Sequence, residues 1–145
     1  MLHKHCANLS EIILLKKEMK NRILFVDDEV DITEFLCYNF NKKGFEVKKA
    51  NDAFQALDVL KDWTPDILVS DILMPEMDGI ALCQQIKRRE NLKHIPVVFL
   101  SAISDDYKVL SAMNSGADHF ISKPVKVDLL VRVIDQILEN KTSAA

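Results

Sequence analysis

Five polar side chains suited to phosphoryl chemistry each follow a short apolar run in the sequence. They are Asp27, Asp28, Asp71, Ser101 and Lys123. An aspartate carboxylate can act as the nucleophile that accepts a phosphoryl group, and we predict this role for Asp71. A lysine supplies a flexible point charge for a phosphate oxygen, and a serine hydroxyl can donate a hydrogen bond to the same group. Transfer to a carboxylate then needs mainly in-line positioning and charge neutralisation.

The three aspartates would repel one another if the fold brought them together. Neighbouring strands of a sheet lie about 5 Å apart, so carboxylates at the ends of adjacent first and third strands would crowd a small space. A divalent cation is the natural counter-charge, and Mg²⁺ tends to take one or two carboxylates, several waters and a phosphate. We therefore predict a site for Mg²⁺, or for a similar cation such as Mn²⁺, at Asp27, Asp28 and Asp71.

Short apolar runs rich in β-branched residues predict the strands that would position these side chains. The predicted strands span residues 23–26, 45–49, 67–70, 97–100 and 117–122. Stretches with apolar residues at helical spacing separate the strands and follow the last one, as at Leu36 and Phe40 after the first strand. Strand and helix thus alternate five times.

This alternation predicts parallel strands joined by right-handed crossovers, with helices on both faces of one doubly wound sheet. Residues 67–69 are apolar without alternation, as expected for a strand that is buried on both sides. In an α/β fold of this type, ligands bind at the carboxyl ends of the strands. The five polar residues all stand at that edge of the predicted sheet.

Four stretches of the sequence, taken together, resemble one known protein family. They are residues 23–29 (ILFVDDE), 66–79 (DILVSDILMPEMDG), 96–102 (PVVFLSA) and 116–124 (GADHFISKP). In this order, each near the end of its predicted strand, they are similar to the CheY-like receiver domains of two-component response regulators. The resemblance covers residues 21 to about 140. It implies an α/β, flavodoxin-like fold with a five-stranded parallel sheet in the order 2-1-3-4-5 and five helices.

The resemblance also implies roles for the individual site residues. Asp71 would be the phosphoacceptor, and Asp28 and Asp71 would bind Mg²⁺. Asp27 would assist through water, and the backbone carbonyl of Leu73 would complete the protein ligands. Lys123 would pair with the phosphoryl group. The chain would therefore be a signalling phosphoacceptor that assists its own phosphorylation and dephosphorylation, rather than an enzyme.

A conformational switch and a set of partners follow from the same resemblance. The hydroxyl of Ser101 would move toward the phosphate and the ring of Phe120 would turn inward behind it, as a two-state element biased by a local charge change. The peptide bond before Pro124 would be cis. A sensor histidine kinase or phosphotransfer protein would supply the phosphoryl group. The fourth helix, fifth strand and fifth helix would form the face for a downstream effector, and phosphorylation could promote a homodimer.

Two positions beside the site carry apolar residues where polar groups could position a hydrolytic water. They are Leu73, two residues after Asp71, and Ile103, two residues after Ser101. We hypothesise that the absence of polar groups there makes the phosphorylated form comparatively long-lived.

Composition and charge narrow the possible function classes. A length of 145 residues and a net charge of -3 are typical of one soluble globular domain. Lysine and arginine do not cluster with aromatic residues, so we expect no direct binding to nucleic acid. The apolar runs are too short to cross a bilayer and no signal-peptide pattern is present, so we expect a cytoplasmic protein without membrane contact.

The pattern along the chain predicts an N-terminal extension over residues 1–20, a receiver domain over residues 21–140 and a short tail over residues 141–145. We interpret the extension as upstream sequence or sequence added for expression, in preference to a functional N-terminal helix. A stand-alone regulator and a piece of a longer protein both agree with this organisation. Cys6, Cys37 and Cys83 are widely spaced and without a metal-binding pattern, so we interpret them as reduced thiols.

Two alternative functions differ from a phosphorylated receiver. A haloacid dehalogenase-type phosphatase also forms an aspartyl-phosphate, but it needs a second aspartate two residues after its nucleophile, and position 29 is Glu. A receiver-like module could also act only in docking or dimerisation, without phosphorylation. The presence of the acid pair, the acceptor, the hydroxyl and the lysine argues against this second alternative.

Overall fold

The computed structural model describes residues 8–12 and 19–143 of the chain. Residues 9–12 form a short helical segment, and the remaining elements lie between Arg22 and Ser143. The predicted extension and tail lie partly outside the described residues, and the predicted domain boundaries stay predictions. The side chains discussed below belong to residues 8–12 and 19–141.

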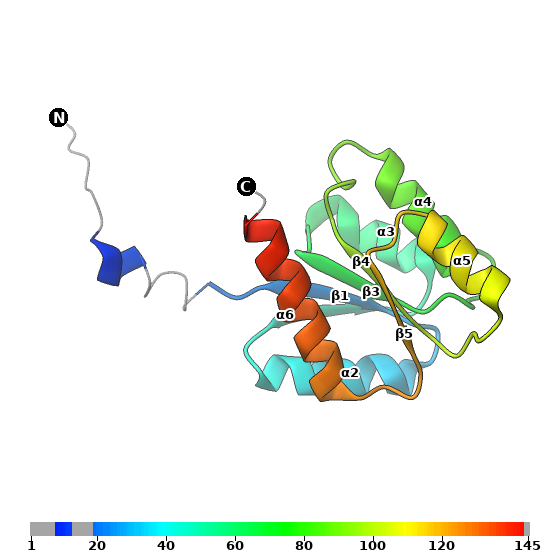
Figure 1. Cartoon of the computed structure of the whole chain (residues 1–145), viewed down its shortest axis with the longest axis horizontal. Helices are drawn as coiled ribbons and strands as arrows, with labels where there is room; N and C mark the ends of the chain where they lie inside the picture. Colours follow the sequence, from blue (N-terminus) through cyan, green and yellow to red (C-terminus); the bar gives the residue numbers. More distant parts are fainter. Residues whose placement is uncertain (1–7, 13–18, 144–145) are drawn as a thin grey trace.

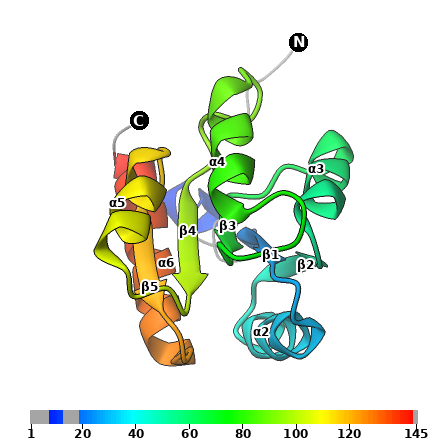
Figure 2. The same cartoon turned by 90° about the vertical axis from the view of Figure 1, so that its right-hand side faces the viewer.

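Five parallel strands form one sheet in the described part of the chain. The strands are β1 (Arg22–Val26), β2 (Glu46–Ala50), β3 (Ile67–Ser70), β4 (Val97–Ser101) and β5 (His119–Ser122). They lie side by side in the order β2-β1-β3-β4-β5 (Figure 2). Val26 of β1 pairs with Ala50 on one side and with Ser70 on the other. The predicted α/β fold class and strand order are confirmed.

Two strands begin later in the structure than the sequence pattern indicated, and local hydrogen bonds explain both shifts. The amide of Phe45 donates to the carbonyl of Phe40, 3.1 Å away, so Phe45 still belongs to the turn that ends the preceding helix. β5 begins at His119 rather than at residue 117. Gly116 has a φ of +103° and Asp118 closes the turn by accepting from the amide of Val97 at 2.8 Å.

Five helices connect or follow the strands. They are α2 (Val30–Lys42), α3 (Ala53–Asp62), α4 (Gly79–Arg88), α5 (Asp106–Asn114) and α6 (Val127–Ser143). Three of them start at an aspartate whose carboxylate accepts from an amide of the first turn, as expected for N-capping residues. Asp78 caps α4 in this way, because its carboxylate accepts from the amide of Ala81 at 2.8 Å.

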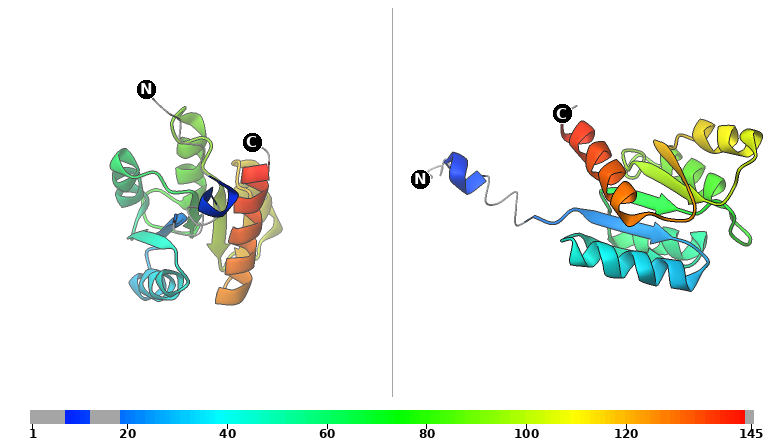
Figure 3. Two further views of the ribbon diagram at one scale, coloured as in Figure 1. Left: turned by 90° about the vertical axis from the view of Figure 1, so that its left-hand side faces the viewer. Right: turned by 60° about the horizontal axis from the view of Figure 1, so that its bottom comes forward.

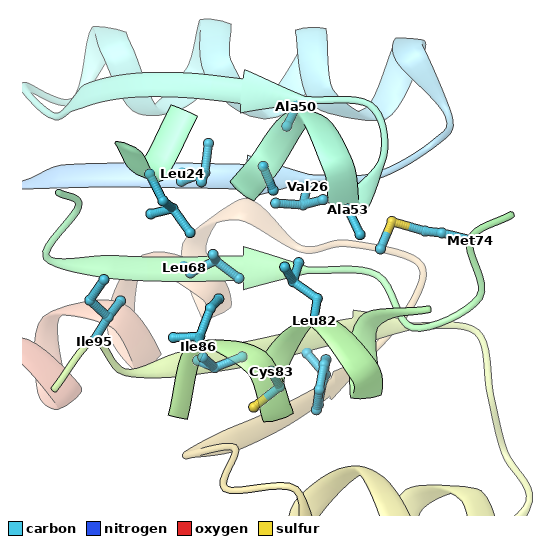
Figure 4. Close-up of a cluster of buried hydrophobic side chains, with 14 of the residues drawn as sticks. Leu24, Val26, Ala50, Ala53, Leu68, Met74, Leu82, Cys83, Ile86 and Ile95 are labelled. Carbon is cyan, nitrogen blue, oxygen red and sulfur yellow. The ribbon is translucent and has the colours of Figure 1, made fainter. Parts of the chain in front are cut away.

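The helices cover both faces of the sheet, with α2 and α6 on one face and α3, α4 and α5 on the other (Figure 1). On the second face, Leu82, Cys83 and Ile86 of α4 pack toward Leu68 of β3 (Figure 4). Every residue of β3 and β4 is buried. These two central strands therefore read as continuous apolar runs, because neither face of the sheet meets water there.

Two further predictions concern the chain as a whole. Among the helices of the described residues, none combines the length and the apolar character needed to cross a membrane. Cys37 and Cys83 are free thiols, which confirms their interpretation as unpaired cysteines. Cys6 lies outside the described residues.

Candidate functional site

The predicted site residues stand at the edge of the sheet where the strands end. Figure 3 shows this edge, toward which the arrows of the strands point. Asp27 directly follows β1, Asp71 follows β3 and Lys123 follows β5, while Ser101 is the last residue of β4. The amide of Asp71 donates to the carbonyl of Val26 at 2.8 Å, which continues the pairing of β1 and β3. This hydrogen bond holds Asp71 beside Asp27 and Asp28.

Three carboxylates lie close enough together to share a cation. One oxygen atom from each of Asp27, Asp28 and Asp71 falls within 4.8 Å of the others. Asp27 and Asp71 are buried, whereas Asp28 is exposed. Hard divalent cations prefer oxygen ligands of this kind, so the donor set agrees with the predicted Mg²⁺ site.

Lys123 supplies the positive charge of the cluster. Its Nζ atom lies 2.8 Å from Oδ2 of Asp27, 3.3 Å from Oδ2 of Asp71 and 3.4 Å from Oε1 of Glu29. The side chain of Lys123 is only 13% exposed. Its backbone amide donates to the carbonyl of Ser101 at 2.9 Å, which holds the end of β5 against β4.

Asp27 and Asp71 use their two carboxylate oxygens in the same way. Oδ1 of Asp27 accepts from the amide of Glu29 at 2.9 Å, and Oδ1 of Asp71 accepts from the amide of Ile72 at 2.7 Å. Oδ2 of each aspartate then faces Lys123. The local backbone thus fixes the orientation of each carboxylate, and the lysine joins the two.

The pKa values of two of these groups reflect this crowding. Burial raises the pKa of Asp27 above its ordinary value, although the hydrogen bonds from Lys123 and from the amide of Glu29 oppose the shift. Burial also lowers the pKa of Lys123, but its hydrogen bond to Asp27 and the charges of Asp71 and Asp27 outweigh that effect and raise it overall. Lys123 is therefore a cation at neutral pH.

Ser101 and Phe120 lie on the neighbouring strands β4 and β5, where Ser101 pairs with Ser122. Ser101 is fully buried, and its Oγ accepts from the amide of Ile103 at 3.3 Å. Phe120 pairs with Phe99 and packs, half-buried, against the cluster under α3, α4 and α5. The switching roles that the sequence analysis gave to Ser101 and Phe120 stay predictions.

The loops around Asp71 and Lys123 complete the site. The peptide bond between Lys123 and Pro124 is cis. Leu73 is 57% exposed and lines an open groove together with Phe54 and Met77. Gly79 packs so closely on the backbone of Asp71 that a Cβ atom at this position would overlap the Asp71 carbonyl oxygen.

Two residues of this region were absent from the predicted site. Glu29 directly follows the acid pair and contacts Lys123, so a third acid in that run was the available signal. Asn51 stands directly after β2, and its Nδ2 donates to the carbonyl of Asp27 at 3.1 Å. No site residue was predicted at the end of the second strand, although ligands of an α/β fold bind at the carboxyl ends of its strands.

A doubly wound parallel sheet with an aspartate cluster and a lysine at its carboxyl edge defines a flavodoxin-like protein of the receiver type. The family model of the response regulator receiver domain matches residues 23–135. The chain therefore belongs to the response regulator receiver domain family. This finding confirms the family that the four sequence stretches resembled.

The chain is similar to curated transcriptional and response regulators. It is 32% identical over 113 residues to the DNA-binding dual master transcriptional regulator RpaA of Synechocystis sp. (strain ATCC 27184 / PCC 6803 / Kazusa), with coverage of 77% of this chain and 47% of RpaA. It is 33% identical over 128 residues to the DNA-binding response regulator MtrA of Mycobacterium tuberculosis (strain ATCC 25618 / H37Rv). This match covers 88% of this chain and 55% of MtrA. The chain thus spans about half the length of the curated relatives it matches.

Solved structures agree with the fold and the family. The signal receiver domain of a signal transduction histidine kinase from Syntrophus aciditrophicus has 35% sequence identity and a TM-score of 0.77, covering 83% of this chain and 91% of that domain. A CheY-like response regulator receiver domain protein from Methanospirillum hungatei JF-1 has a TM-score of 0.82 at 24% identity. This match covers 88% of this chain and 100% of that protein. The second likeness concerns the fold alone.

Proposed function

We propose that Asp71 accepts a phosphoryl group from a phosphohistidine of a cytoplasmic sensor kinase or phosphotransfer protein. One observation carries the proposal: Nζ of Lys123 contacts the buried carboxylates of both Asp71 and Asp27, within a cluster of three carboxylates. In the transfer, a carboxylate oxygen of Asp71 forms a bond to phosphorus while the phosphorus–nitrogen bond of the donor breaks. The leaving imidazole keeps the electron pair of that bond.

The residues around Asp71 would bind a cation and stabilise the charge of the phosphoryl group. Asp27, Asp28, Asp71 and the backbone carbonyl of Leu73 would hold a divalent cation such as Mg²⁺. When bound, that cation supplies charge neutralisation between the carboxylates and the phosphoryl oxygens. Lys123 contributes a fixed positive charge beside Asp71, and little reorganisation is needed because two aspartates already hold it in place.

The signal would leave the site through Ser101 and Phe120. Both residues lie on the strands that join the site to the face formed by α5, β5 and α6. That face exposes large apolar side chains, with Tyr107 at 85% and Leu110 at 58% exposure. Exposed apolar residues of this kind support a role of the face in binding a downstream effector or a second copy of the chain.

Intact mass spectrometry after incubation with acetyl phosphate and Mg²⁺ tests the proposal. We expect the protein to gain the mass of one phosphoryl group and the Asp71→Asn variant to gain none. Asp58→Asn, which changes an exposed aspartate of α3 that pairs with Lys61, is the matched control and should be phosphorylated normally. An unchanged mass of the unsubstituted protein would instead favour a module that works by docking alone.

A further inference from the structure

A chain of hydrogen bonds links the end of β2 to the acidic loop and to α2. The side chain of Asn51 donates from Nδ2 to the backbone carbonyl of Asp27 and to Oγ1 of Thr33, each at 3.1 Å. Thr33 is fully buried in α2, and its hydroxyl donates to the carbonyl of Val30 at 2.9 Å. The amide of Asn51 itself donates to Oε1 of Gln55 at 2.9 Å.

This arrangement determines which end of the Asn51 amide faces the acidic loop. The hydroxyl proton of Thr33 is directed to Val30, so its oxygen acts as an acceptor toward Asn51. The carbonyl of Asp27 can only accept a hydrogen bond. Both hydrogens on Nδ2 of Asn51 therefore face hydrogen-bond acceptors. If the side-chain amide were flipped, Oδ1 of Asn51 would face the same two acceptors without a hydrogen between them.

The carbonyl that Asn51 holds belongs to the peptide group between Asp27 and Asp28. The amide of Asp27 also donates to the carbonyl of Ala50 at 3.1 Å, so the backbone of Asp27 is anchored on both sides by the end of β2. These two contacts set the plane of the peptide group and the direction in which the backbone continues to Asp28.

Asp28 depends on this backbone anchor more than the other two aspartates do. Asp27 and Asp71 each have an amide donor and Lys123 as side-chain partners. In the part of the chain that the structure describes, no group donates a hydrogen bond to the carboxylate of Asp28. Its place beside the other carboxylates therefore depends on where the backbone carries it and on its own side-chain torsions.

We propose that Asn51 is a positioning residue for the acidic cluster and that Thr33 orients it for this role. The pair holds the Asp27–Asp28 peptide group in the orientation that brings three carboxylates within 4.8 Å of one another. It thereby sets the affinity of the cluster for a divalent cation. This inference rests on the proposed function, because it concerns the cation site of that function.

Mg²⁺ binding measured by isothermal titration calorimetry on the full chain tests the inference without any phosphorylation step. Loss of outer contacts of a metal site commonly weakens binding by a factor of 10 to 100, and we expect Asn51→Ala to weaken Mg²⁺ binding about tenfold. Thr33→Val, which keeps the shape but removes the hydroxyl, should cause a smaller loss in the same direction. Thermal unfolding in a chelator shows whether each variant is folded.

Asn39→Ala is the matched control, because Nδ2 of Asn39 also donates to a backbone carbonyl, that of Phe35, at 2.8 Å. Asn39 lies on α2 and not at the acidic loop, so its replacement should leave Mg²⁺ affinity unchanged. The inference is overturned if Asn51→Ala binds Mg²⁺ within about twofold of the unsubstituted protein, or if Asn39→Ala weakens binding equally. If Asn51→Ala does not fold, Thr33→Val takes its place. The inference is then overturned if Thr33→Val binds Mg²⁺ as tightly as the unsubstituted protein does.

The unsubstituted protein and Asp28→Asn separate this inference from the proposed function. If the unsubstituted protein binds Mg²⁺ and Asp28→Asn binds it weakly, the cation site stands and the result for Asn51 decides the inference alone. If the unsubstituted protein does not bind Mg²⁺, the cation site of the proposed function is wrong and the inference is overturned with it.

Discussion

Nζ of Lys123 lies 2.8 Å from Oδ2 of Asp27, although 96 positions separate the two residues in the sequence. Both side chains are largely buried, with 13% and 4% exposure. The lysine is closer to this aspartate than to Asp71, at 3.3 Å. Asp71 thus shares the ammonium group of Lys123 with Asp27 and with Glu29.

Replacement of Lys123 by Met should slow phosphorylation of Asp71 by acetyl phosphate about 100-fold, because a charge preorganised at the reacting carboxylate is lost. The rate is measured by intact mass spectrometry over time. Lys126→Met, three residues further along and exposed, is the control and should leave the rate unchanged. Equal rates for Lys123→Met and the unsubstituted protein would refute the role of this ammonium.

The apolar residue at position 73 should prolong the life of the phosphorylated form. Leu73 is exposed, so Leu73→Asn can offer an amide to a hydrolytic water without disturbing the core, and we expect loss of phosphate to become about tenfold faster. Loss of phosphate from the protein in Mg²⁺ is followed by mass. Leu110→Asn, at nearly equal exposure on α5, should have no effect. Loss of the phosphoryl group within seconds from the unsubstituted protein would count against the hypothesis. Ile103 is less suited to this test because it is buried.

Gly79 should be far less tolerant of a methyl group than Gly44. A Cβ at position 79 would overlap the carbonyl oxygen of Asp71 and lie 2.9 Å from Cα of Ile72, and backbone atoms cannot easily give way. We expect Gly79→Ala to lower the free energy of unfolding by about 3 kcal/mol.

Gly44→Ala is the comparison for this substitution. Gly44 has a φ of +95° but open space around it, so Gly44→Ala should cost only about 1 kcal/mol of backbone strain. Urea unfolding of both variants gives the two values. Similar losses in the two variants would mean that the contact of Gly79 with the Asp71 backbone does not limit this position.

Cys83 should be protected from alkylation in the folded protein. Burial raises the pKa of its thiol above the ordinary 9.0, and the side-chain hydrogen bond with Ser115 and the charge of Lys87 only partly oppose this. At a given pH the folded state then holds less thiolate than the unfolded state. We expect Cys83 in a Cys6→Ser, Cys37→Ser variant to react with iodoacetamide much more slowly when folded than in urea.

The same shift predicts the sign of a stability change. A raised pKa in the folded state contributes stability that is present below pH 9.0 and is lost as the pH rises through the higher folded value. Urea unfolding at increasing alkaline pH should therefore show a decline that Cys83→Ala reduces. An equal decline in both proteins would show that other groups cause it.

Three features of this protein followed from the order of residues alone. The alternation of apolar runs with helical spacing predicted a parallel α/β fold, because each pattern matches one kind of local structure. Asp27, Asp71 and Lys123 were predictable as neighbours, because parallel strands bring their carboxyl ends to one edge whatever the distance along the chain. Asp78 was predictable as a helix cap, because capping acts within a few residues.

Contacts between distant side chains were decided only by the tertiary structure. Nothing in the sequence distinguishes Asn51 from any other polar residue after a strand, and its contacts with Asp27 and Thr33 arise from the pairing of β1 with β2 and the packing of α2. The closer approach of Lys123 to Asp27 than to Asp71 likewise depends on how the ends of β1, β3 and β5 are arranged in the sheet. Local sequence patterns predict strands and helices because these elements form from neighbouring residues. Differences of a few tenths of an ångström between side-chain distances depend instead on how all the elements pack together.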